Sequence, residues 1–435
     1  MQLFYLKILY FIHINILEAV MARDVLPFIK DYRPNKFVIK VDTQEGCLLY
    51  NTATGSIAVL DVEEDLRDSF EELKKMNDYV PLDFDEIAWV DELRRAHRSN
   101  SQKNGIHSFT ILTTTECNAR CFYCYEKGQH QKPMSDDTAR DVAAYIASVS
   151  PNSPVDLHWF GGEPLYNPRV IDIISNLLTE KGIKYQSTMI SNGLLFTDSI
   201  IRKAKGTWKL KRVQITLDGT KDVYQKSKAY KNANGDEFDR VIDSIRRLSE
   251  AGIHVSIRLN QEFYNTEDLL ELVLYLSETF KGNKHISVYN NWLYSEKNEK
   301  DILLEEKKYE QFNRLQERII DLGMYSNPTL KKRMKYSHCM ADNDSAVLIT
   351  PNGEIGKCEH YTDQHLIGSI YNQSFDEVER ARWKEEYPTT AKCLDCPLYP
   401  QCYRIKMCPI EGEQCSWFEC ENRIELIKSA LLQSI

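Results

Sequence analysis

Proline and glycine are scarce in this sequence, at 14 and 18 of 435 residues, and it contains no low-complexity tract and no repeat of fixed period. These absences exclude collagen-like, repeat-built and largely disordered chains. Positive charge is also in the minority, because 64 Asp and Glu outnumber 55 Lys and Arg, and the basic residues form no stripe interleaved with aromatics. We therefore expect a globular protein of two or three domains that does not bind nucleic acid.

Residues 1–20, MQLFYLKILYFIHINILEAV, lack the unbroken apolar core of a membrane span, because Lys7, His13 and Glu18 interrupt them. No clear small-residue cleavage site follows, as a signal peptide would require. The stretch is marginal for a bilayer span. We expect no membrane attachment, and we expect Met21 to be the true initiator.

Twelve cysteines are present, and their grouping predicts metal or cluster binding. Cys47 stands alone, three lie at 117–124, and eight lie at 339–420. Tight C-x2-C and C-x3-C spacings in a long acidic chain are typical of ligation in a reducing compartment, whereas a secreted disulfide framework is usually short. Cys47 is interpreted as a buried apolar thiol.

From about residue 107 to 323, short β-branched runs alternate with amphipathic stretches, which is typical of βα units on a parallel sheet. Six strands are expected, at residues 108–114, 155–160, 185–190, 212–217, 254–259 and 286–290. Each is apolar or rich in β-branched residues, so we expect both faces of the sheet to be covered. Six units are too few for a closed eight-stranded barrel, which leaves an open doubly wound sheet or a partial barrel. Either fold binds ligands at the C-terminal ends of its strands.

A small module is expected before this α/β core, and it ends at a polar linker. The module is predicted from strands at 37–42, 47–50 and 56–60, helices at 64–76 and 83–97, and the linker at 98–105. The expected division is an N-terminal extension (1–35), the small module (36–100), the core (101–330) and a cysteine-rich C-terminal domain (331–435).

Residues 116–124, ECNARCFYC, carry C-x3-C-x2-C spacing directly after the first core strand. Thiolates from Cys117, Cys121 and Cys124 would leave one iron of a [4Fe-4S] cluster without a protein ligand. An open coordination site can bind a substrate-like molecule, whereas a cluster with four thiolates only carries electrons. The alternatives are a structural zinc or a cluster completed by a distant cysteine.

This spacing, with an aromatic residue before the third cysteine, resembles the radical S-adenosylmethionine (SAM) superfamily. The resemblance extends to FGGEP at 160–164, SNG at 191–193 and ITLDG at 215–219, at the ends of the second, third and fourth strands. It implies a partial, TIM-like (β/α)6 barrel that binds SAM at the open iron. It also implies cofactor contacts at Tyr123, Gly162, Glu163, Thr216, Lys228 and Leu259.

The residue types at these positions suit a SAM site. Gly161 and Gly162 lack a Cβ and would let the backbone approach the SAM amino group. Hydroxyl and cationic groups at the strand ends can bind its carboxylate. Thr216 and Lys228 differ from the Ser and Arg that relatives commonly carry, and Lys keeps the charge of Arg but not its fork.

The eight C-terminal cysteines resemble the SPASM domain, which binds two auxiliary [4Fe-4S] clusters. The implied ligands are Cys339, Cys358 and Cys408 for the cluster nearer SAM, and Cys393, Cys396 and Cys402 for the outer one. Cys415 or Cys420 would complete the outer cluster, and the other thiol would close the inner cluster or leave an iron open to substrate. The five residues between Cys402 and Cys408 exceed the three usual in this family. Zinc binding by the paired cysteines is the alternative.

Glu359 directly follows Cys358, where sulfatase-maturing relatives place a catalytic Asp. A carboxylate beside a cluster can accept a proton while a substrate radical is oxidised, so Glu359 is the candidate catalytic residue. A solvated surface glutamate is the alternative interpretation.

The resemblance implies a cytoplasmic enzyme in which a flavodoxin- or ferredoxin-type donor drives cleavage of SAM to a 5′-deoxyadenosyl radical. Most SPASM enzymes modify peptides or proteins, and the small module resembles winged-helix-like elements that bind leader peptides. We therefore expect maturation of a ribosomally synthesised precursor peptide by thioether or carbon–carbon crosslinking. A formylglycine-forming sulfatase maturase is the alternative with the same chemistry. A non-catalytic iron–sulfur electron-transfer or zinc-binding scaffold is the alternative of another class.

Overall fold

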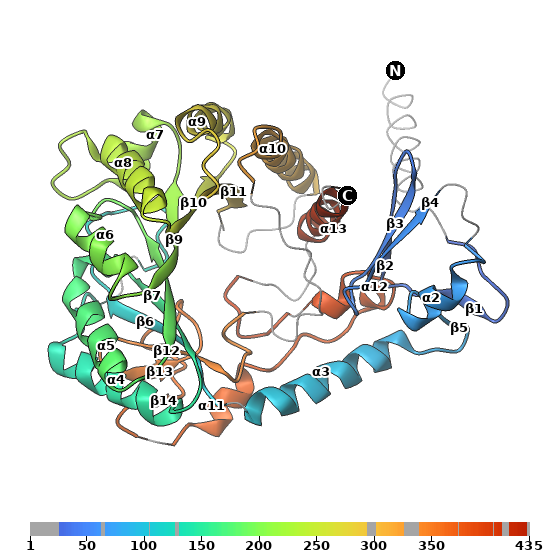
Figure 1. Cartoon of the computed structure of the whole chain (residues 1–435), viewed down its shortest axis with the longest axis horizontal. Helices are drawn as coiled ribbons and strands as arrows, with labels where there is room; N and C mark the ends of the chain where they lie inside the picture. Colours follow the sequence, from blue (N-terminus) through green and yellow to red (C-terminus); the bar gives the residue numbers. More distant parts are fainter. Residues whose placement is uncertain are drawn as a thin grey trace.

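The computed structural model describes residues 26–61, 66–103, 105–126, 130–293, 302–325, 339–372, 374–402, 404–410 and 417–432. Figure 1 shows a curved sheet with helices along its outer side, and a long helix, α3 (Glu86–Lys103), that leads to a smaller N-terminal module. Among the described helices, none is both long and apolar enough to cross a bilayer.

Six parallel strands form the centre of the sheet and lie side by side in chain order. They are β6 (Ser108–Thr114), β7 (Val155–Gly161), β8 (Tyr185–Ser191), β9 (Leu210–Leu217), β10 (His254–Gln261) and β11 (Ile286–Trp292). These strands confirm the six that the sequence predicts. Because their order never reverses, the sheet lacks the switch point of a doubly wound fold, and the partial barrel is the architecture observed.

The C-terminal region continues the same sheet. β12 (Ala346–Ile349) pairs in parallel with β6, and β13 (Glu354–Gly356) and β14 (Gly368–Ser369) follow as antiparallel strands. Segments on either side of the expected boundary at residue 330 therefore share one hydrogen-bonded sheet.

Helices on the outer face connect the strands. They are α4 (Asp136–Val149), α5 (Pro168–Glu180), α6 (Asp198–Lys205), α7 (Lys221–Lys228), α8 (Glu237–Glu250), α9 (Thr266–Thr279) and α10 (Ile302–Asp321), with the short 3-10 helix η1 (Pro164–Tyr166) after β7. Ser135 begins α4 as expected, because its Oγ accepts a hydrogen bond from the Thr138 amide at 3.0 Å. This satisfies one of the amides that a helix N-terminus leaves without an internal partner.

The two faces of the central sheet differ, which corrects the expectation that both are covered. Along β7 the side chains of Leu157 and Trp159 are buried, and the alternating His158 lies on the opposite face, which we call the inner face. Thr188 on β8 and Arg212 on β9 continue the row of His158. The inner face is polar because a partial barrel carries helices only on its outside, so no apolar layer packs there.

The N-terminal module contains a three-stranded antiparallel sheet and a two-stranded one. The first is β2 (Val38–Asp42), β3 (Gly46–Asn51) and β4 (Ile57–Asp61); the second is β1 (Tyr32–Pro34) and β5 (Tyr79–Pro81), with α2 (Phe70–Lys75) between the two. β2, β3 and β4 agree with the expected strands to within about a residue, whereas β1 and β5 were not predicted. The expected linker at 98–105 is wrong, because α3 continues to Lys103. Polar residues alone do not break a helix, and the first strong breaker is Gly105, whose φ is +67°.

The module packs on the cysteine-rich C-terminal segment. That segment holds α11 (Glu377–Arg382), α12 (Ala391–Leu394), the 3-10 helix η2 (Tyr399–Gln401) and α13 (Trp417–Leu432). Ile39, Leu48 and Tyr50 of the module share one buried cluster with Leu398 and Leu431. The N-terminal and C-terminal parts of the chain are therefore joined by an apolar core of their own.

Candidate active site

The cysteine loop follows β6 and lies at the C-terminal edge of the parallel strands, as expected. Main-chain bonds join it to the end of α7, because the Arg120 amide donates to the Lys228 carbonyl at 2.9 Å and the Lys231 amide donates to the Asn118 carbonyl at 2.7 Å. The loop is thus held between β6 and the segment that follows β9.

Cys117, Cys121 and Cys124 are free thiols on this loop. Burial raises the pKa of Cys117 to about 12 and that of Cys124 to about 11, and the three sulfurs interact electrostatically with one another. Thiols in such surroundings become good ligands only when a metal cation replaces the proton. Within the described part of the chain no three metal-binding side chains converge on one ion site. Three thiolates that each bind a separate iron of a cluster need not converge in that way, so the donor set fits a [4Fe-4S] cluster.

Gly161 and Gly162 allow the end of β7 to contact the base of this loop. A Cβ on Gly161 would lie 2.0 Å from the Thr114 carbonyl oxygen, and one on Gly162 would lie 2.4 Å from the Glu116 carbonyl oxygen. The Gly162 amide donates to the Thr114 oxygen at 3.1 Å. These glycines therefore let the end of β7 approach the main chain at the start of the cysteine loop. The sequence suggested that they would let the backbone approach SAM.

Glu163 is fully buried, and protein groups occupy its carboxylate. Oε1 accepts from the Leu165 amide at 3.1 Å and from Ser191 Oγ at 2.9 Å, and Oε2 accepts from the Asn192 amide at 2.7 Å. Burial raises the pKa of Glu163 to about 7. Asn192 in turn donates from Nδ2 to Asn118 Oδ1 at 2.7 Å, inside the cysteine loop. Glu163 therefore links the ends of β7 and β8 to that loop.

Three of the expected SAM contacts meet in one buried network. Lys228 donates from Nζ to Thr216 Oγ1 at 2.6 Å and to Tyr123 OH at 2.7 Å. Lys228 Nζ also forms an ion pair with Asp218 Oδ2 at 3.2 Å. Tyr123 OH donates a hydrogen bond to Asp218 Oδ1 at 2.9 Å. Burial opposes the charge of Lys228, but Asp218 raises the pKa of the ammonium overall. The site therefore contains a fully buried ion pair beside the cysteine loop.

Asp218, Asn260 and Asn192 were missed as site residues by sequence reasoning. Asn260 donates from Nδ2 to Asp218 Oδ1 at 2.8 Å and so joins the end of β10 to the network. The LDG string at 217–219 was a signal for Asp218, since it follows a strand directly. Leu259, by contrast, is fully buried in the core, which leaves its main chain as the part a ligand can contact.

The expected inner-cluster cysteines lie near one another. Cys358 interacts electrostatically with Cys339 and Cys408, and burial raises the pKa of the Cys358 thiol to about 12. The donor set is again three thiols, from three separate segments of the C-terminal region. Here too the residues fit a cluster.

Glu359 lies where this cysteine group meets the first cysteine loop. The ring of Tyr125 stacks on that of His360, with centroids 4.0 Å apart and planes at 27°. Glu126, which sequence reasoning missed, has a pKa raised to about 7, first by burial and second by the charge of Glu359. Oε1 of Glu126 is buried without a hydrogen-bond partner. Two carboxylates thus lie between the two cysteine groups.

The expected outer-cluster cysteines lie against the N-terminal module. Cys393 packs beside Phe37 and Val90, whereas Cys396 packs in the same cluster as Cys420 of α13. Cys415 lies outside the described residues.

Residues 111–276 match the family model of the Radical SAM superfamily, so the chain contains a radical SAM domain. This sets aside the non-catalytic alternative, and the family implies a [4Fe-4S] cluster and SAM as cofactors. The GTP 3′,8-cyclase of Clostridium perfringens strain 13 is 24% identical over 269 residues, which cover 58% of this chain and 80% of that relative. The radical SAM cyclopropyl synthase TigE of Paramaledivibacter caminithermalis is 24% identical over 182 residues, covering 38% and 37%.

Two solved structures share the fold. Native anSMEcpe with bound AdoMet superposes with a TM-score of 0.56 at 15% identity, covering 75% of this chain and 98% of that one. Streptococcus suis SuiB bound to precursor peptide SuiA superposes with a TM-score of 0.53 at 14% identity, covering 88% and 99%.

Proposed function

We propose that this enzyme modifies a ribosomally synthesised precursor peptide by thioether or carbon–carbon crosslinking. The observation that carries the proposal is the loop of Cys117, Cys121 and Cys124, joined by hydrogen bonds to the buried Asp218–Lys228 pair. The peptide part is supported by the likeness to SuiB bound to its precursor peptide, which extends over 88% of this chain. This support comes from the shared fold and not from sequence identity, which is 14%.

A cluster held by these three thiolates, with SAM bound, would supply radical chemistry for hydrogen abstraction. The residues of the chain position and shield that chemistry. Glu163 and Asn192 hold the cysteine loop, and Tyr123, Thr216 and Lys228 present hydroxyl and ammonium groups at the same edge for the carboxylate of SAM. Glu359, with Glu126 beside it, is suited to take up the proton released when the new bond forms.

The C-terminal cysteines are proposed to hold two auxiliary [4Fe-4S] clusters, which would supply an acceptor for the electron that the substrate releases. Cys339, Cys358 and Cys408 would hold the inner cluster. The outer cluster would be held by Cys393, Cys396 and Cys402, together with Cys415 or Cys420. Cys396 and Cys420 pack against the same apolar cluster, which supports Cys420 as this ligand. A flavodoxin- or ferredoxin-type protein is the proposed donor to the first cluster.

Residues 36–100 are proposed to bind the leader part of the peptide. Among the described strands, β4 is an edge of its sheet, and the alternate side chains of Ile57 and Val59 are 37% and 61% exposed. An apolar strand edge with free main-chain groups is a template for an added strand. The leader would add there as a fourth strand.

The test is anaerobic reconstitution followed by assay for 5′-deoxyadenosine with dithionite as reductant. We expect SAM cleavage by the wild-type protein and none by a variant with Cys117, Cys121 and Cys124 all changed to Ala. Mass spectrometry of a co-expressed candidate precursor should then show the loss of two hydrogens per crosslink. Cleavage of SAM at the wild-type rate by the triple variant would refute the proposal.

Formylglycine formation is the second candidate, supported by the likeness to anSMEcpe and by the carboxylate of Glu359 next to Cys358. The two functions differ in product. Oxidation of a single Cys or Ser to an aldehyde, trapped by a hydrazide reagent, would favour the maturase.

A further inference from the structure

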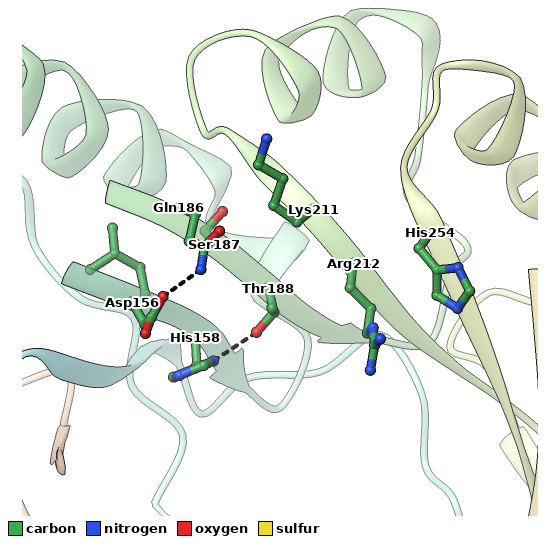
Figure 2. A pocket seen from close by; sticks show the side chains of 9 residues that line it. Asp156, His158, Gln186, Ser187, Thr188, Lys211, Arg212 and His254 are labelled. Atoms are coloured by element: carbon green, nitrogen blue, oxygen red, sulfur yellow. Dashed lines mark hydrogen bonds between the residues drawn. The ribbon is translucent and has the colours of Figure 1, made fainter. Parts of the chain in front are cut away.

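The inner face of the barrel contains a cavity at the N-terminal ends of its strands. The cavity has a volume of about 290 Å³ and includes His158, Thr188, Arg212 and His254 in its lining. Figure 2 shows these side chains projecting from four adjacent strands. The register confirms the row, because His158, Thr188, Arg212 and His254 are consecutive partners across β7 to β10.

Most polar groups in this cavity are occupied by their neighbours. Both ring nitrogens of His158 are hydrogen-bonded, to Ser108 Oγ at 3.2 Å and to Thr188 Oγ1 at 2.7 Å. Asp156 accepts a hydrogen bond from Gln186 Nε2 at 2.8 Å. Arg212 and Lys211 are the exceptions, since within the described part of the chain neither exposed side chain has a hydrogen-bond or ion-pair partner.

A second guanidinium, that of Arg258, lies on the same face, nearer the C-terminal ends of the strands. Arg258 pairs in register with Thr216, four residues along β9 from Arg212, or about 13 Å at the usual rise per residue. Arg258 donates from Nε to Asn260 Oδ1 at 3.1 Å, and Asn260 donates to Asp218. Its two terminal nitrogens have no partner in the described structure, and both arginines act electrostatically on Tyr289. One hydrogen-bonded path therefore runs from Arg258 to the network beside the cysteine loop.

The charge of this face is opposite to that of the chain. The protein has a net charge of −9, yet the inner face of β6 to β11 presents Arg212 and Arg258 against the single acid Asp156, which is already hydrogen-bonded. A concave surface with two unpaired guanidinium groups attracts anions and binds planar carboxylates through paired hydrogen bonds. A neutral or cationic substrate would leave both charges uncompensated.

We propose that Arg212 and Arg258 each bind the carboxylate of an Asp or Glu side chain of the substrate, so that the enzyme selects peptides with an acidic residue in the segment that enters the barrel. This rests on the proposed function in taking the substrate to be a peptide. Arg258 would hold the acid next to the site of hydrogen abstraction, and Arg212 would hold one deeper in the barrel.

The experiment measures binding and needs no turnover. Fluorescein-labelled Gly-Ser-Gly-Glu-Gly-Ser-Gly and its Gln counterpart are titrated with the reconstituted protein and SAM under anaerobic conditions, and fluorescence anisotropy gives each affinity. We expect the Glu peptide to bind about tenfold more tightly, as one charge-assisted hydrogen-bond pair predicts, and the preference to decrease with salt. Arg212→Gln and Arg258→Gln should each reduce the preference.

Arg202→Gln is the matched control, because Arg202 is exposed on α6 outside the barrel and its loss removes the same charge. It should keep the full preference. Equal affinity for the two peptides, including no measurable binding of either, overturns the proposal. Tighter binding of GTP than of the Glu peptide also overturns it, since the face would then be a phosphate site. A Glu preference without any crosslinked product would refute the proposed function and leave this inference standing.

Discussion

Arg94 of the N-terminal module donates a hydrogen bond from Nη2 to the main-chain carbonyl oxygen of Cys402 at 2.8 Å, across 308 residues of sequence. The same nitrogen donates to the Tyr399 carbonyl oxygen at 2.5 Å, and the guanidinium lies 4.6 Å from the centroid of the Tyr399 ring. Gln401 adds a bond from Nε2 to Tyr50 OH at 3.0 Å. The module is thereby attached to the segment that carries the proposed outer-cluster ligands.

Arg94→Ala should loosen this attachment. It would leave one buried and one partly buried carbonyl oxygen without their charged donor, which costs about 2–3 kcal/mol. Iron content after reconstitution should decrease while SAM cleavage remains, because the first cysteine loop is elsewhere. Arg95→Ala is the matched control, since Arg95 is the next residue on α3 and is exposed. Unchanged urea unfolding and unchanged iron content in Arg94→Ala would contradict this role.

Gly161→Ala should prevent formation of the cysteine-loop site. Its Cβ would lie 2.0 Å from the Thr114 carbonyl oxygen, at a φ of +125° that L-residues avoid. Gly182→Ala is a fair comparison, because its φ is +72° but no atom lies within 4 Å of the added Cβ. We expect the second variant to lose about 1 kcal/mol and to bind iron normally. Gly182→Ala reports on backbone strain alone, whereas Gly161→Ala adds the clash. Iron content and 5′-deoxyadenosine production are measured for both variants, and equal values in the two would refute the packing argument.

Lys228→Met should destabilise the fold by about 3–5 kcal/mol, because Asp218 would remain buried without its cation. Adding Asp218→Asn should recover part of that loss, since the remaining charge is then removed as well. Urea unfolding of the four proteins in the cycle measures the coupling. Lys221→Met, which breaks an exposed pair with Asp239, should change stability far less, because solvent screens that pair. Strict additivity of the two buried substitutions would show that the pair is not coupled.

Asp78→Asn should stabilise the N-terminal module more at pH 7 than at pH 5. Burial raises the pKa of Asp78 from 3.8 to about 6, and its Oδ2 is buried without a partner. The folded carboxyl therefore holds its proton more tightly than the unfolded one, so its contribution to stability decreases as the pH rises from about 4 to about 6. Thermal unfolding at a series of pH values should show a difference between variant and wild type that grows over this range. Asp61→Asn, at an exposed position, is the matched control.

The sequence predicted the parts of this molecule that depend on local spacing. The six core strands and the cysteine loop follow from period and motif, and both lie where expected. Asp218, Asn260 and Glu126 could not be found in the same way, because their importance comes from partners on other strands and loops. The end of α3 was misjudged for a related reason, since polarity was taken as a break where only Gly105 interrupts the helix.

The inner face was also misjudged, because the apolar and β-branched residues of β7 and β9 indicate strands without indicating how many faces of the sheet are covered. Helices lie only outside the barrel, and the alternating polar residues His158 and Arg212 carried that information. Hydrogen-bond register, which sequence does not give, is what brought them into one row.

The pairing of β12 with β6 sets an order of events during synthesis on the ribosome. One side of β6 has its strand partner only after roughly 230 further residues have been made, since β6 ends at Thr114 and β12 ends at Ile349. At ~5–20 residues per second this leaves an open strand edge, next to the cysteine loop, for tens of seconds. A chain truncated before β12 would keep that edge open permanently, and it should accumulate in inclusion bodies.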